Sequence, residues 1–215
     1  MHRTTNYPLD HIGRNFGTDQ SSLHHDYLHI LERYFELRRN EAINLLEIGV
    51  AGGGSIRTWH EYFPHAAIYG IDHNHEYINA LELAMTVEKW HARVRLVEGD
   101  AERVETWARF KDWGDPMFDI IIDDGSHLSG KIIETFHCGF THLAPKGLYI
   151  IEDLHAVYDE AKKVNSDKFI HAVEYFKNWV DMVNEQGGGY IGKPSPEAPI
   201  KSLHFYKSLV IIERA

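Results

Sequence analysis

The chain has 215 residues, 43% of them hydrophobic and 25% charged, so it is long enough for one globular domain with a continuous core. A formal net charge of −10 excludes a protein that wraps nucleic acid, because phosphate neutralisation needs clustered Lys and Arg. A single Cys138, no apparent secretory leader and no run of ~20 apolar residues together predict a cytoplasmic protein that does not enter the membrane.

An amphipathic helix is expected near the start of the chain. Residues 23–39 place apolar side chains at three- and four-residue spacings, after the turn-like Gly17-Thr18-Asp19. We therefore assign residues 1–40 to an N-terminal helical segment.

The middle of the chain alternates between predicted strands and helices. Five apolar runs without polar alternation are the predicted strands: Ile43 to Val50, Ala67 to Ile71, Val94 to Val97, Phe118 to Ile122 and Leu148 to Ile151. Such continuous apolar strands are typical of a parallel sheet that is covered on both faces. The expected fold class is α/β, with a doubly wound, mostly parallel, Rossmann-like sheet.

The C-terminal third is expected to complete the same domain. Residues 168–186 have a helical apolar face, and residues 187–200 combine three glycines with prolines. Two strand segments within 202–213, separated by a turn near Lys207, predict an antiparallel end to the sheet. We expect one domain over residues 1–215, with a cap helix and a mobile loop over 158–200.

The glycine turn after the first strand indicates the kind of cofactor. A dinucleotide motif, Gly-x-Gly-x-x-Gly, fails because Ala51 or Arg57 occupies a required glycine position, and no phosphate-binding Gly-Lys-Ser/Thr is present. What remains is Glu47-x-Gly49-x-x-x-Gly53, in which glycines let the backbone approach a ligand without phosphate. This resembles motif I of class I methyltransferases, which packs against the methionine part of S-adenosylmethionine. The alternative interpretation is that this glycine turn binds no cofactor and only allows the first strand and the following helix to pack closely.

Two aspartates at the ends of the next strands suit the same cofactor. Asp72 follows the glycines by about twenty residues, the spacing at which ribose hydroxyls are bound in such sheets. Asp100 would then lie near the adenine and accept a hydrogen bond from its exocyclic amine. Either residue could instead be a loop-start residue or a helix N-cap.

Three carboxylates at the ends of the fourth and fifth strands predict a divalent metal site. Asp124 and the pair Glu152-Asp153 can converge where hard cations take oxygen ligands, and Mg²⁺ is the default choice. Such a metal can hold two substrate oxygens and lower the pKa of a hydroxyl. His127 is placed to remove the proton as general base. The alternative is that the acids are caps and His127 is a turn residue.

Nearly the whole chain resembles the magnesium-dependent sugar O-methyltransferases of the mycinamicin and tylosin type, which tailor macrolide and polyketide glycosides. The resemblance is carried by Gly17-Thr18-Asp19, Leu45 to Val50 with Gly53-Gly54-Ser55, Gly70-Ile71-Asp72, Ile122 to His127, Ile151 to His155 and Ser202 to Tyr206. It implies that Asp124, Glu152 and Asp153 are metal ligands and that His127 is the base. The expected cofactor-binding set is Glu47, Gly49, Gly53, Ser55, Asp72, Asp100 and Asp123. Where members often have Gly-Asp-Gln after the third strand, this chain has Gly99-Asp100-Ala101.

The expected function is transfer of a methyl group from S-adenosylmethionine to a hydroxyl of a sugar or other natural-product acceptor, in antibiotic biosynthesis. The cofactors are S-adenosylmethionine and Mg²⁺ or another divalent cation, and the partner is a hydroxylated, optionally glycosylated small molecule, with no nucleic acid or membrane. A homo-oligomeric state is left open. The alternatives are a catechol or phenol O-methyltransferase and a non-catalytic S-adenosylmethionine-binding protein, while Ala51 disfavours an NAD oxidoreductase.

Most of the 16 histidines have no metal-like spacing. Surface or packing roles are expected for His24, His25, His65, His73 and His75. His155 and Tyr158 follow the metal acids and are expected to line the acceptor pocket.

Overall fold

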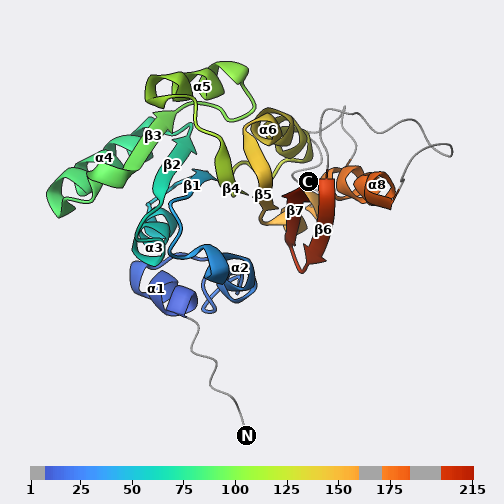
Figure 1. Cartoon of the computed structure of the whole chain (residues 1–215), viewed down its shortest axis with the longest axis horizontal. Coiled ribbons are helices and arrows are strands. Elements are labelled where there is room, and N and C mark those ends of the chain that lie inside the picture. Colours follow the sequence, from blue (N-terminus) through green and yellow to red (C-terminus); the bar gives the residue numbers. More distant parts are fainter. Residues whose placement is uncertain (1–7, 160–170, 185–199) are drawn as a thin grey trace, which may run out of the picture.

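A computed structural model describes residues 8–159, 171–184 and 200–215 (Figure 1). The strands are β1 (Asn44–Ile48), β2 (Ala67–Asp72), β3 (Val94–Glu98), β4 (Phe118–Asp123), β5 (Leu143–Ile151), β6 (Ile200–Tyr206) and β7 (Leu209–Arg214). The α-helices are α1 (Pro8–Phe16), α2 (Leu28–Phe35), α3 (Gly54–Tyr62), α4 (His75–Glu88), α5 (Val104–Ala108), α6 (Ser129–Thr141) and α8 (Ala172–Asn184). Short 3-10 helices are η1 (Glu36–Arg38), η2 (His91–Arg93), η3 (Arg109–Trp113) and η4 (Leu154–Tyr158).

The seven strands form one sheet in the order β3-β2-β1-β4-β5-β7-β6. The first five strands in this order pair in parallel, while β7 is antiparallel to β5, and β6 to β7. The predicted mostly parallel α/β sheet with an antiparallel C-terminal end is confirmed. The strand order reverses between β1 and β4, which is where open sheets of this kind bind their ligands.

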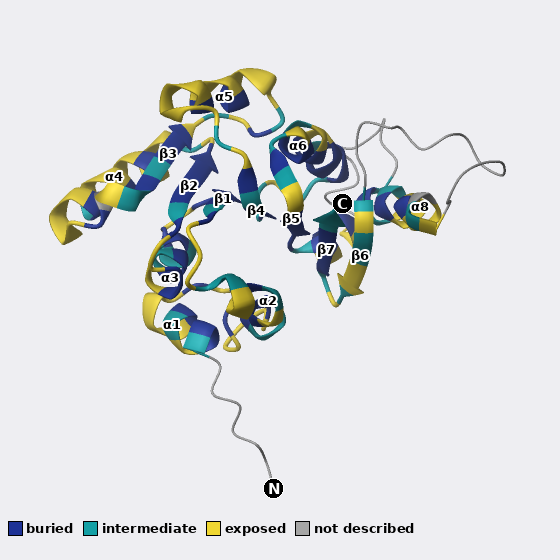
Figure 2. Ribbon diagram, in the orientation of Figure 1, coloured by how far each residue is buried: buried dark blue, intermediate teal, exposed yellow. Residues whose placement is uncertain are grey.

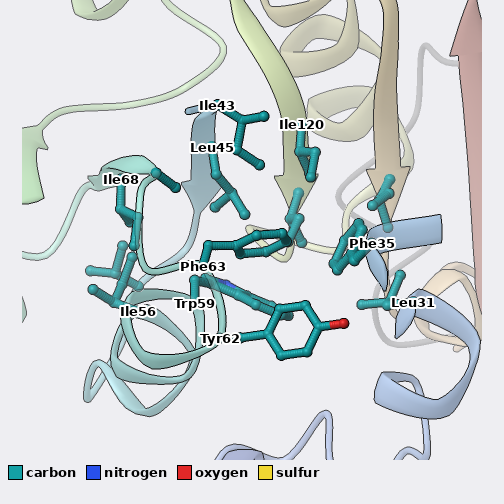
Figure 3. Packing of buried hydrophobic residues seen from close by; sticks show 14 of the residues in the cluster. Leu31, Phe35, Ile43, Leu45, Ile56, Trp59, Tyr62, Phe63, Ile68 and Ile120 are labelled. Atoms are coloured by element: carbon teal, nitrogen blue, oxygen red, sulfur yellow. The ribbon is translucent and has the colours of Figure 1, made fainter. Parts of the chain in front are cut away.

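Helices cover both faces of the sheet, as the mostly apolar strands without regular polar alternation predict (Figure 2). Leu45 and Leu46 are neighbours on β1, point to opposite faces and are both fully buried. On the Leu45 face, residues of α1 to α4 form one core cluster, in which Trp59 and Phe63 pack against the strands (Figure 3). On the Leu46 face, residues of α5, α6 and α8 form the second cluster.

The N-terminal segment differs from the single helix predicted over residues 23–39. Helix α2 begins at Leu28, because residues 20–27 fold into a turn in which the Tyr27 and Leu28 amides both donate to the Gln20 carbonyl (2.9 and 3.2 Å). Leu23, assigned to the apolar helical face, is 63% exposed. Helix α1, which buries Leu9 against α2 and α3, was not predicted, since its nine residues contain few apolar side chains.

The C-terminal segment follows the prediction where the structure describes it. Helix α8 occupies the middle of the helix expected over residues 168–186, and β6 and β7 meet at a turn over Lys207 and Ser208. The mobile loop predicted within 158–200 lies, over residues 160–170 and 185–199, outside the described residues. Among the residues described, no helix is both long and apolar enough to cross a bilayer.

Candidate active site

The ends of neighbouring strands are aligned by hydrogen bonds that continue one residue past the sheet. The Asp124 amide donates to the Ile48 carbonyl (2.9 Å), and the Glu152 amide donates to the Asp123 carbonyl (3.0 Å). The Gly49 amide likewise donates to the carbonyl of Ile71 (2.8 Å). The acidic residues that follow separate strands are therefore brought to one edge of the sheet.

A cavity of about 630 Å³ opens at this edge. All predicted site residues line it except Glu47 and Glu152; those that do are Gly49, Gly53, Ser55, Asp72, Asp100, Asp123, Asp124, His127 and Asp153. Phe16, Gly17, Thr18 and Asp19 from the N-terminal segment also line it, as do Glu102 and Lys131. The cavity thus extends from the glycine turn to the acids after β4 and β5.

The glycine turn is shaped for close backbone approach. Gly49 has φ +87°, and a Cβ atom there would lie 2.1 Å from the carbonyl oxygen of Asp124. One oxygen of the Asp72 carboxylate accepts hydrogen bonds from the amides of Val50 and Ala51, both at 3.0 Å, while the other accepts from Asn74 (2.8 Å). Asp72 therefore holds the glycine turn in place and still faces the cavity.

Glu47, expected to bind the cofactor, lies behind the glycine turn rather than in the cavity. Its side chain is fully buried and accepts hydrogen bonds from Ser55 Oγ (2.8 Å), Trp59 Nε1 (3.2 Å) and Gln20 Nε2 (3.5 Å). Burial raises its pKa to about 7, against the opposing effect of these three donors. Successive side chains of β1 point to opposite faces of the sheet, so Glu47 lies on the same face as Leu45 and points toward α3. It therefore supports the glycine turn through Ser55 and Trp59 and does not line the cavity itself.

The other two predicted cofactor residues occupy different settings. Asp100 is exposed at the cavity, and its backbone is held by a hydrogen bond from Thr106 Oγ1 to its carbonyl (2.7 Å). Asp123 is 4% exposed, and one carboxylate oxygen accepts from the Gly125 amide at 3.3 Å. Burial raises the pKa of Asp123 to about 7.

Asp124, His127 and Asp153 come close enough to share a cation, while Glu152, the third predicted carboxylate ligand, lies outside this group. One potential ligand atom from each of Asp124, His127 and Asp153 lies within 4.8 Å of the others. Glu152 is 1% exposed, and neither of its carboxylate oxygens has a hydrogen-bond partner within 3.5 Å among the described residues, although the Gln20 side chain is near enough to oppose the rise of its pKa. Burial, and then the charges of neighbouring carboxylates, raise the pKa values of Asp124 and Glu152 well above the usual range.

This group offers the oxygen and nitrogen ligands that a cation needs, and its negative charge is not balanced by a nearby Lys or Arg side chain that the structure describes. Buried carboxylates without donors are costly to keep ionised, and a divalent cation offsets that cost while taking oxygen ligands. The unpartnered oxygens of Glu152 are the observation that fits such an ion.

Two residues of the site adopt left-handed backbone conformations that are unusual outside glycine. His127 has φ +55° and Asp153 has φ +53°. His127 Nε2 lies 3.9 Å from Asp153 Oδ2, and both side chains are partly accessible from the cavity. Backbone strain of this kind, roughly 1–3 kcal/mol each, concentrates at functional sites, where the surroundings hold the residue in place.

A family comparison identifies the domain. Residues 46–154, about half of the chain, match a family model described as a methyltransferase domain. The chain belongs to this methyltransferase family.

The chain is similar to curated proteins that are named as O-methyltransferases. It is 33% identical to the mycinamicin VI 2''-O-methyltransferase of Micromonospora griseorubida, over 96% of this chain and 52% of the relative. It is 31% identical to the 8-demethyl-8-alpha-L-rhamnosyl tetracenomycin-C 2'-O-methyltransferase of Streptomyces olivaceus, over 92% and 52%. The chain thus spans about half the length of the curated relatives it matches.

A solved structure of the same kind shares the fold. MycE methyltransferase from the mycinamycin biosynthetic pathway, in complex with Mg and SAH, superposes with a TM-score of 0.79 at 29% identity. The match covers 96% of this chain and 53% of MycE. The α/β sheet described above is therefore that of a methyltransferase domain.

The N-terminal segment brings two residues to the site that were not predicted to belong to it. Tyr27 Oη donates a hydrogen bond to Asp153 Oδ1 (2.7 Å), and burial together with that carboxylate raises the pKa of Tyr27, so the hydroxyl remains a donor. His25, expected to have only a surface or packing role, places Nδ1 3.8 Å from Asp153 Oδ1. No local pattern marks these residues, because their partner lies more than 120 residues away in the chain.

The remaining predictions near the site have mixed outcomes. His155 Nδ1 lies 3.7 Å from Asp153 Oδ1, but neither His155 nor Tyr158 lines the methyltransferase cavity. His73 does line it, and His75 pairs with Glu98 at 2.7 Å on the surface.

Proposed function

We propose that this chain transfers a methyl group from S-adenosylmethionine to a hydroxyl of a glycosylated natural product, assisted by a divalent cation, with Mg²⁺ the expected ion. One observation carries the proposal. Glu152, fully buried with both oxygens unpartnered, adjoins Asp124 at the edge of a cavity whose glycine turn is built for a ligand without phosphate.

The cofactor would occupy the part of the cavity between the glycine turn and Asp100. Gly49 and Gly53 allow its methionine portion to approach the backbone. A carboxylate has about four acceptor positions, so Asp72 can accept from ribose hydroxyls in addition to its three backbone donors. Asp100 would accept from the adenine amine. The SAH in the MycE complex supports this assignment, since it is the product left when S-adenosylmethionine gives up its methyl group.

Asp124, Glu152 and Asp153 would hold the cation. When bound there, it supplies positive charge that lowers the pKa of a substrate hydroxyl and orients two neighbouring substrate oxygens. Relief of the repulsion that these carboxylates exert on one another supports the assignment.

His127 would act as general base. Its Nε2 atom would accept the proton of the substrate hydroxyl as the oxygen attacks the methyl carbon, and the carbon–sulfur bond breaks with its electron pair returning to sulfur. Asp153, with Oδ2 3.9 Å from Nε2, would stabilise the resulting imidazolium.

A sugar hydroxyl is preferred over a catechol as the acceptor. Two adjacent oxygens suit either acceptor, but the matched relatives are named for methylation of a rhamnosyl tetracenomycin C and of mycinamicin VI, and neither is named for a catechol. We therefore place the chain in the tailoring of glycosylated antibiotics.

The cofactor is tested by isothermal titration with S-adenosylmethionine and with NAD, each with Mg²⁺ and with EDTA. We expect S-adenosylmethionine to bind and NAD not to bind. The acceptor is tested by incubating the chain, labelled S-adenosylmethionine and Mg²⁺ with a rhamnosylated polyketide or with catechol, and following label transfer. Binding of NAD without S-adenosylmethionine would refute the proposal, and label transfer to catechol alone would refute the sugar acceptor.

A further inference from the structure

We propose that Tyr27 is a positioning residue for the cation site, and that its hydroxyl orients Asp153 so that the loop over residues 20–27 sets the affinity for the metal. The inference rests on the proposed function, because it assumes that Asp153 binds the cation. It concerns a segment that the sequence motifs of the site do not include.

The two oxygens of Asp153 have different surroundings. Oδ1 accepts the Tyr27 hydroxyl at 2.7 Å, whereas Oδ2 is the oxygen closer to His127 Nε2. Tyr27 thus occupies Oδ1, which His25 and His155 also approach at 3.8 and 3.7 Å. This leaves Oδ2 as the oxygen nearer to His127. The hydrogen bond from Tyr27 restricts rotation of the Asp153 carboxylate.

Tyr27 is itself held rigidly. Its amide donates to the Gln20 carbonyl (2.9 Å) and its carbonyl accepts from the Leu31 amide (2.9 Å), which joins the loop to α2. At the other end of the loop, Ser22 donates through its amide (2.7 Å) and its hydroxyl (2.8 Å) to the Asp10 carboxylate. The hydroxyl of Tyr27 is therefore presented from a fixed scaffold, which is what a supporting contact requires.

The surroundings also separate Tyr27 from bulk water and from the cofactor. Tyr27 is 3% exposed, and the His25 ring stacks on it with centroids 5.3 Å apart and planes 14° from parallel. Tyr27 does not line the cavity. Removing its hydroxyl should therefore weaken metal binding while leaving cofactor binding intact, a separation that a general loss of stability would not produce.

The test is Tyr27→Phe in the full chain, titrated with Mn²⁺ by electron paramagnetic resonance. Loss of a contact that orients a metal ligand typically weakens metal affinity roughly 10- to 100-fold, and we expect a rise of that size in the Mn²⁺ Kd. The Kd for S-adenosylmethionine should be unchanged. Tyr34→Phe is the matched control, because it removes a tyrosine hydroxyl from the same helical region whose 2.7 Å partner is Tyr206, away from the cation site.

The outcomes separate this inference from the proposed function. If the wild-type chain binds Mn²⁺ and Tyr27→Phe binds it equally well, the positioning role is wrong and the metal site stands. If the wild-type chain does not bind Mn²⁺, or if Asp124→Ala binds it as tightly, the proposed metal site is wrong and this inference with it. Should Tyr27→Phe be less stable, the Mn²⁺ concentration that gives a set rise in Tm still reports affinity, and an unshifted concentration would overturn the inference.

Discussion

Glu47→Gln should remove a large pH dependence from the stability of the chain. Glu47 is fully buried, and its pKa rises from 4.5 to about 7 on folding. An acid with a raised folded pKa binds its proton more tightly in the folded chain. Its contribution to stability is therefore greatest below pH 4.5, falls as the pH rises to about 7 and is constant above that.

The size of the effect follows from the shift. At about 1.4 kcal/mol per pH unit, a rise from 4.5 to about 7 corresponds to about 3.5 kcal/mol, of which about 2.5 kcal/mol falls between pH 5 and pH 8. Glutamine stays neutral at both values, so the variant should lack this loss. The charge of Glu47 also raises the pKa values of Asp124 and Glu152, so relieving it adds to the difference.

The assay is urea unfolding at the two pH values in the presence of EDTA, for the wild-type chain and the variant. For each protein, the unfolding free energy at pH 8 is subtracted from that at pH 5. This difference does not contain the pH-independent loss of stability that arises when the amide introduced by Glu47→Gln faces the donors Ser55 and Trp59. Glu82→Gln, which changes an exposed carboxylate on α4, is the control and should behave as the wild type. Equal losses of unfolding free energy in the wild type and Glu47→Gln between pH 5 and pH 8 would refute the reasoning.

Three further variants test the site. Asp124→Ala should abolish metal-dependent methyl transfer while S-adenosylmethionine still binds, as measured by titration, and normal turnover in chelator would contradict the metal role. His127→Ala should lower the rate roughly 10²- to 10⁴-fold, and a pH–rate profile identical to that of the wild type would exclude it as base. Gly49→Ala should lower the free energy of unfolding by more than about 1 kcal/mol, because its Cβ would lie 2.1 Å from a carbonyl oxygen at φ +87°. Gly52→Ala has open space at its Cβ and is the control, and equal unfolding midpoints for the two variants would argue against this packing.

The strands and the acids that follow them were predictable because both depend on local signals. A mostly apolar run such as Phe118 to Ile122, which only Asp119 interrupts, indicates a strand buried on both faces, and the carboxyl ends of parallel strands share one edge of the sheet. Asp72, Asp124 and Asp153 could therefore be placed at one cavity from the chain alone.

Glu47 shows where such reasoning fails. Its position in the motif indicated a cofactor contact, but its side chain points away from the cavity, toward the sheet face that α3 covers. There Ser55, Trp59 and Gln20 donate hydrogen bonds to its carboxylate. The sheet face that α3 and the N-terminal segment cover decides this outcome, and local sequence does not specify it.

The sequence by itself determined the α/β sheet, the glycine turn and the acids at the strand ends, because apolar periodicity and turn chemistry act over a few neighbouring residues. Only the tertiary structure decided that β4 lies beside β1, that Glu152 is buried without a partner and that Tyr27 meets Asp153. These features depend on contacts between segments far apart in the chain, whose geometry is set by how the helices pack on the two faces of the sheet.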